Sequence, residues 1–146
     1  MGKFTNRSIE RFVLAQEDSY ENALSEIKQG RKRTHWIWYI FPQLSGLGKS
    51  NSSIAYAIYG LEEAKEYLAH PILSARLKEI SEALLAIDNT NAIDILGPID
   101  AKKVHSSMTL FSLISEDGSI FHKVLDKYYG GKLDKRTLEL LNGQNN

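Results

Sequence analysis

The residues best suited to chemistry lie in two short segments of the chain. The first runs from His35 to Gln43 across two tryptophans, and the second carries Lys103 four residues before Ser107. Histidine is the side chain whose ordinary pKa lies near neutrality, so His35 is the first candidate for a general acid or base. A lysine one helical turn before a serine shares its helix face, which is the pairing of an activated hydroxyl nucleophile. We therefore take His35, Lys103 and Ser107 as candidate catalytic residues, with surface lysine and close-packed serines as the alternative.

The aromatic segment also predicts a binding pocket. Ligand pockets are mostly apolar with a few well-placed polar groups, and this segment has polar residues at both ends of an aromatic run. Indole rings offer stacking surface, while amide, hydroxyl and cationic groups suit an anion. A buried amide at position 16 would either tie helices together or face such a pocket. The candidate ligand-binding residues in and around this segment are Gln16, Trp36, Trp38, Gln43, Gly46, Gly48 and Ser50.

A Gly- and Ser-rich stretch, GLGKS at positions 46–50, follows the aromatic segment. It fails as a P-loop because Gln43 stands where the first glycine is needed, and as a dinucleotide fingerprint because Asn51 replaces the third glycine. A Gly-rich turn before a helix still presents backbone N–H groups that suit an anion. An ordinary loop is the alternative interpretation.

Composition excludes several kinds of site. The chain has no cysteine, so thiol catalysis, disulfides and cysteine-bound zinc are impossible. None of the four histidines is paired at the i, i+4 spacing of a helical zinc site, and we expect neither a metal nor a cofactor. The 18 basic and 18 acidic residues balance, which argues against a nucleic-acid partner. A local basic cluster at 28–33 is best explained as a solvated helix end.

The longest apolar stretch, Trp36 to Phe41, is far shorter than the roughly 20 residues of a membrane span. The first ten residues lack the apolar core of a secretory signal. We therefore expect a soluble, cytoplasmic protein. The sequence sets no oligomeric state.

Apolar spacing predicts the elements that position these residues. The 146 residues suit one domain over 1–146, ordered from about 8 to 141, with a frayed tail at 142–146. We expect an all-α fold of seven or eight helices, with a Gly/Ser-rich loop after the aromatic segment, which could itself be a strand or a buried helical turn. The predicted helical ranges are 9–27, with a break at 18–19, 54–59, 61–69, 71–87, 98–115, 119–128 and 135–141, with one turn at 92–96.

The two segments together resemble the domain of unknown function 1810 family. The resemblance covers about 9–141 and includes the string HWIWYIFPQ, the following glycines, and KVHSSMTLF from Lys103, with His70-Pro71 and Arg76. It implies a small all-α fold and brings no established activity. Its pattern falls on polar and aromatic residues such as Gln16, which is what a site requires. The resemblance adds Arg76 and Ser106 to the candidate ligand-binding residues. This chain departs from the family pattern at Ser74, where glycine is usual.

These observations predict a pocket for a small anionic, nucleotide-like ligand, lined by the residues named above. Hydrolysis or transfer at a nucleotide-type bond is the reaction we would test first. The alternative is a non-catalytic protein-interaction module in which the aromatic segment is structural core.

Overall fold

The computed structural model describes residues 8–144, which form ten helices and no strand. Seven of the helices have eight or more residues, and three short ones have four or five, so the number is slightly above the expected seven or eight. The all-α, single-domain prediction is confirmed. The helices are α2 Glu10–Glu17, α3 Tyr20–Lys28, α4 Ile37–Ile40, α5 Asn51–Ala55, α6 Leu61–Ala69, α7 Pro71–Ala86, α8 Ala92–Leu96, α9 Pro98–Ser112, α10 Ile120–Tyr129 and α11 Lys135–Gln144.

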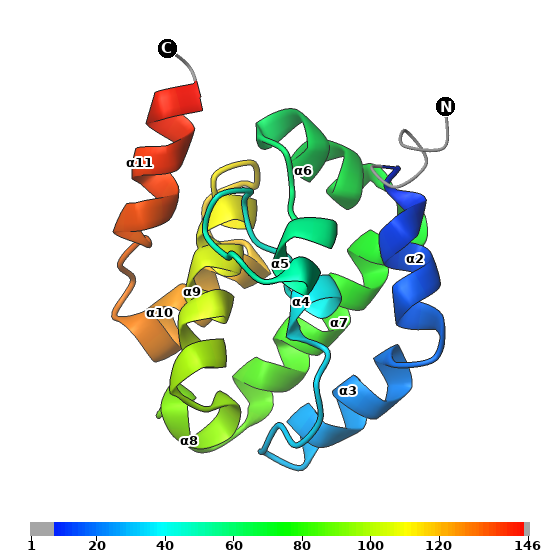
Figure 1. The fold of residues 1–146 in the computed structure, drawn as a ribbon. Helices are drawn as coiled ribbons and strands as arrows, with labels where there is room; N and C mark the ends of the chain where they lie inside the picture. Colours follow the sequence, from blue (N-terminus) through cyan, green and yellow to red (C-terminus); the bar gives the residue numbers. More distant parts are fainter. Residues whose placement is uncertain (1–7, 145–146) are drawn as a thin grey trace.

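Helix α7 crosses the middle of the molecule (Figure 1). It packs against α3, α6 and α10, whereas α9 packs against α8, α10 and α11. The buried face of α7 carries Leu73, Leu77, Ile80 and Leu84 at spacings of three and four residues. That stripe is the apolar face an amphipathic helix must cover, which places α7 at the centre of the core.

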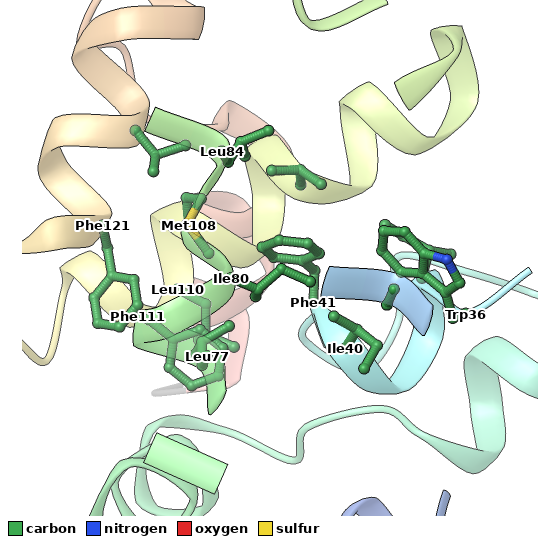
Figure 2. Close-up of a cluster of buried hydrophobic side chains, with 14 of the residues drawn as sticks. Trp36, Ile40, Phe41, Leu77, Ile80, Leu84, Met108, Leu110, Phe111 and Phe121 are labelled. Atoms are coloured by element: carbon green, nitrogen blue, oxygen red, sulfur yellow. The ribbon is translucent and has the colours of Figure 1, made fainter. Parts of the chain in front are cut away.

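The aromatic segment forms the single helical turn α4 and supplies part of the core. Trp36 and Phe41 are buried at its two ends, and Figure 2 shows them in one cluster with Ile80 and Met108. Strand propensity is overridden here because no neighbouring strand is available to pair with this segment. The only strand-like pairing among the described residues is an isolated parallel bridge between Leu44 and Ile58.

Most predicted helix boundaries agree with the structure to within one residue; both ends of α5, the end of α9 and the end of α11 differ. The break at 18–19 separates α2 from α3. Helix α5 begins at Asn51, earlier than expected, because the Ser50 hydroxyl accepts a 3.1 Å hydrogen bond from the Ser53 amide and starts the helix there. Helix α11 continues past Leu141 to Gln144, and the last two residues of the predicted frayed tail lie outside the described part. No helix within residues 8–144 is long and apolar enough to cross a bilayer.

Candidate functional site

A surface hollow of about 310 Å³, which we call the basic hollow, brings together three segments distant in the sequence. The loop after α4 contributes Gln43, Leu47 and Gly48; helix α9 contributes Ile99, Lys102, Lys103 and Ser106; the start of α11 contributes Asp134 and Arg136. Four of the predicted site residues therefore lie around one hollow: Gln43, Gly48, Lys103 and Ser106.

A short chain of hydrogen bonds joins the loop to α9 inside the basic hollow. The Gln43 amide nitrogen donates to the Ser106 hydroxyl oxygen at 2.6 Å, and that hydroxyl donates to the Lys103 carbonyl at 3.0 Å. The hydroxyl proton of Ser106 is therefore used in a hydrogen bond to the helix backbone. The Gln43 side-chain oxygen accepts no hydrogen bond from the described residues, which leaves it for a ligand or water.

Lys103 is held above an aromatic ring. Its ammonium nitrogen lies 5.5 Å from the centroid of the Trp38 ring, a cation–π contact that favours one position of a flexible side chain. Trp38 is half-buried, and its indole nitrogen is buried without a hydrogen-bond partner in the described part of the chain. Trp38 thus stands beside the hollow and positions the lysine that lines it.

The charges of the basic hollow favour an anion. Lys102, Lys103 and Arg136 form no salt bridge with any carboxylate in residues 8–144. The one carboxylate of the hollow, Asp134, is engaged elsewhere: it accepts hydrogen bonds from the Thr137 amide at 3.0 Å and hydroxyl at 2.6 Å, and so caps α11. Three cations against one carboxylate leave a local positive excess on a chain whose net charge is zero.

The structure does not bring Lys103 and Ser107 together as base and nucleophile. Ser107 is fully buried, and its hydroxyl has no hydrogen-bond partner among the described residues. The Lys103 ammonium lies over Trp38 instead. Activation of a serine requires a base within hydrogen-bond reach of the hydroxyl, and this arrangement lacks one.

His35 and Trp36 also lie apart from the basic hollow. His35 is exposed, while Trp36 is buried and donates its indole N–H to Glu26 at 3.0 Å. The same carboxylate accepts from the backbone amides of Arg33 and Thr34 at 2.7 and 3.0 Å. Burial raises the pKa of Glu26, but the hydrogen bonds from Thr34, Arg33 and Trp36 outweigh that effect and lower the pKa to about 2. Trp36 is therefore part of a structural anchor for the segment before α4.

Gln16 and Arg76 meet at a second polar junction. The Gln16 amide nitrogen donates to the Tyr39 carbonyl at 2.7 Å and to the Tyr67 hydroxyl at 3.0 Å. Arg76 donates to the Gln16 side-chain oxygen at 3.3 Å and lies over the Tyr20 ring. Of the two interpretations of Gln16, the tie between helices is the one found, and it joins α2, α4, α6 and α7.

Three residues of the Gly-rich loop were predicted for the site: Gly46, Gly48 and Ser50. Of these, Gly48 alone lines the basic hollow. A Cβ at Gly48 would lie 2.4 Å from the Ser53 side chain, so this close approach requires glycine. Gly46 has a φ of +101° and packs near Leu140 of α11, and Ser50 is exposed as the N-cap of α5. Neither Gly46 nor Ser50 is among the residues that line the hollow.

Sequence reasoning missed Lys102, Asp134 and Arg136. Lys102 adjoins a predicted residue, and two consecutive cations on one helix were a usable signal. Asp134 directly precedes the predicted helix 135–141, which is the position of a helix cap. Arg136 lies 33 residues after Lys103, and nothing in their spacing indicates that α11 folds beside α9. No group of three or more metal-ligating side chains gathers within the described residues.

Fold and site together define a small all-α protein with a basic surface hollow. The chain belongs to the family described as "Protein of unknown function (DUF1810)", whose model matches residues 6–141. It is similar to a conserved hypothetical protein, Rv1873 from Mycobacterium tuberculosis, whose crystal structure has a TM-score of 0.89 and 43% sequence identity. That similarity covers 92% of this chain and 96% of the other. No curated protein matches the chain.

Proposed function

We propose that the protein binds a small anionic ligand, of the phosphate-ester or nucleotide type, in the basic hollow. The observation that carries the proposal is the set of three cations without carboxylate partners around one hollow (Lys102, Lys103 and Arg136). The Gln43 amide adds a neutral hydrogen-bonding group at the same place. A volume of about 310 Å³ lies at the lower end of the range for small-molecule sites, which suits a phosphate group with a small substituent.

The geometry supports binding more than bond cleavage. The Ser106 proton is held by a backbone carbonyl, so no base activates this hydroxyl as a nucleophile, and the Asp134 carboxylate caps a helix and is not poised as a base. Hydrolysis or transfer at a nucleotide-type bond stays a prediction. It is checked by incubating the protein with ATP and with ADP-ribose and following both by phosphorus NMR. If product resonances grow no faster with the protein than in the protein-free control, the prediction of hydrolysis or transfer is wrong.

The binding proposal is tested by isothermal titration calorimetry with pyrophosphate and ATP. The variants are Lys103→Gln and Arg136→Gln, with Lys123→Gln as the matched control, since Lys123 is an exposed lysine on α10 whose side chain makes no hydrogen bond or salt bridge in the described part. A lost charged hydrogen bond is worth about 1.5–3 kcal/mol, so each hollow variant is expected to weaken binding by about tenfold or more. Equal affinities for all three variants, or no heat with either probe, would overturn the proposal.

The interaction-module alternative divides into two parts. The burial of Trp36 and Phe41 supports its structural part, since the ends of the aromatic segment belong to the core. Its interaction part stays a prediction, as does the cytoplasmic location. The basic cluster at 28–33 offers limited support for a nucleic-acid partner, because Lys32 already pairs with Asp100 at 2.8 Å.

A further inference from the structure

A second hollow, which we call the aromatic hollow, lies on the same stretch of α9 as the basic hollow. Its volume is about 540 Å³, and its walls include Ile93, Pro98, His105, Tyr128 and Tyr129. Most of these groups are apolar or aromatic. The chemistry of the aromatic hollow therefore differs from that of its basic neighbour.

Two contacts make the hollows neighbours. Lys102 lines both of them. His105 lines the aromatic hollow, and its Nδ1 lies 4.0 Å from the Oδ1 of Asp134, which lines the basic hollow. The first link lies on α9, and the second joins α9 to Asp134 at the start of α11. A molecule bound in one hollow would therefore meet the edge of the other.

The part of the wall formed by His105 and Tyr129 is fixed by ring stacking and by hydrogen bonds. The two rings are stacked, with centroids 4.3 Å apart and planes within 3°. The Nε2 of His105 lies 2.8 Å from the Lys132 carbonyl, which fixes Nε2 as the donor, and the Tyr129 hydroxyl donates to the Ala101 carbonyl at 2.6 Å. A wall whose side chains are already ordered loses little conformational entropy when a ligand binds against it.

We propose that the ligand of this site has two parts, an anionic group in the basic hollow and a planar apolar group in the aromatic hollow. Lys102 lies between the two parts. The chemical class is a phosphate ester of a ring system, such as an aryl phosphate or a nucleoside phosphate. This inference rests on the proposed function, because the anionic part occupies the hollow proposed there. It adds the prediction that the ester substituent contributes to affinity and contacts Ile93.

The test compares methyl phosphate with phenyl phosphate, which carry the same anionic group and differ in the ring. Binding is measured by calorimetry for the unaltered protein and for Ile93→Ser, Lys103→Gln and Leu14→Ser. Ile93 and Leu14 are both exposed apolar residues, at 56% and 67%, and Leu14 lies on α2, away from both hollows. All three substitutions are at positions that are not fully buried, and thermal unfolding checks that each variant is folded.

The expected result has four parts. Phenyl phosphate binds about tenfold more tightly than methyl phosphate, because the ring is removed from water. Ile93→Ser weakens the binding of phenyl phosphate several-fold and leaves the affinity for methyl phosphate unchanged. Lys103→Gln weakens both esters, and Leu14→Ser changes neither.

Two contrary results are distinguishable. In the first, Lys103→Gln weakens the binding of methyl phosphate, but phenyl phosphate binds no more tightly than methyl phosphate, or binds more tightly by a factor that Ile93→Ser does not change. The two-part ligand is then wrong, and the proposed anion site stands. If Lys103→Gln leaves the affinity for both esters unchanged, the proposed function itself fails, and this inference fails with it.

Discussion

The side-chain amide of Gln43 donates a 2.6 Å hydrogen bond to the hydroxyl of Ser106, a residue 63 positions later in the chain. This bond fastens the loop after α4 to the middle of α9. Both residues line the basic hollow, so the bond also determines where the loop wall of the hollow stands.

Replacing Ser106 by alanine should cost about 1 kcal/mol of unfolding free energy, because it removes this neutral hydrogen bond. The loop should also lose its attachment, so anion affinity should fall. Urea unfolding and calorimetry with pyrophosphate check both effects. The control is Ser52→Ala, since the Ser52 side chain makes no hydrogen bond in the described part of the chain. A stability equal to that of the control would contradict the structural role of the bond.

Glu26 should make stability depend on acid pH. Its pKa is lowered from the usual 4.5 to about 2 in the folded protein. A depressed pKa stabilises the folded state above the unfolded value, and the contribution is lost as the pH falls from about 4.5 to about 2. The full effect is on the order of 3 kcal/mol. Unfolding free energies measured across this pH range should fall more steeply for the unaltered protein than for Glu26→Gln.

The control for this measurement is Glu17→Gln, which changes an exposed carboxylate at the end of α2. It should keep the full pH dependence of the unaltered protein. Should Glu26→Gln and Glu17→Gln show the same slope, the hydrogen bonds from Arg33, Thr34 and Trp36 do not stabilise the charged form as described.

Gln16→Leu should destabilise the protein by about 1–3 kcal/mol, because it leaves buried polar partners unpaired at the junction of α2, α4, α6 and α7. The Tyr67 hydroxyl is among these partners. Anion affinity should be unchanged, since Gln16 does not line the basic hollow. Gln29→Leu, at an exposed position, should stay within about 0.5 kcal/mol of the unaltered protein. A loss of anion binding without a loss of stability would instead place Gln16 in the site.

Ser107→Ala should leave stability unchanged or raise it by up to about 1 kcal/mol, because the hydroxyl is buried without a hydrogen-bond partner. Thr109→Val is the contrasting variant. The Thr109 hydroxyl donates to the His105 carbonyl at 2.8 Å and accepts from the Asp134 amide at 2.8 Å, so its loss should cost about 1–2 kcal/mol. Thermal and urea unfolding compare the two. A Ser107→Ala variant that is clearly less stable would mean that the hydroxyl has a partner after all.

Local pattern was sufficient for the longer helices and insufficient for α4, α5 and the site. The boundaries of α6 follow from apolar spacing and from the proline at position 71, both of which act within a few residues. The aromatic segment could be a strand or a helix on propensity alone, and it became α4 because packing against α2 and α9 covers its large side chains. Secondary structure of so short a run depends on its neighbours.

The candidate site shows the same division. Residue type together with the family resemblance selects Gln43, Gly48, Lys103 and Ser106, and all four lie around one hollow. Arg136 could not be assigned to it, because its position depends on how α11 packs against α9. His35 and Trp36 are neighbours of Gln43 in sequence, yet one is exposed and the other binds Glu26 in the core.

By itself, the sequence determined the helical class, the single core, the absence of thiol chemistry and the two segments that carry polar groups among aromatic ones. These properties depend on composition and on spacings within one or two helical turns. Only the tertiary structure decided which polar groups share a surface. Charges that meet in the basic hollow come from segments separated by dozens of residues, and their convergence depends on packing, which no local spacing encodes.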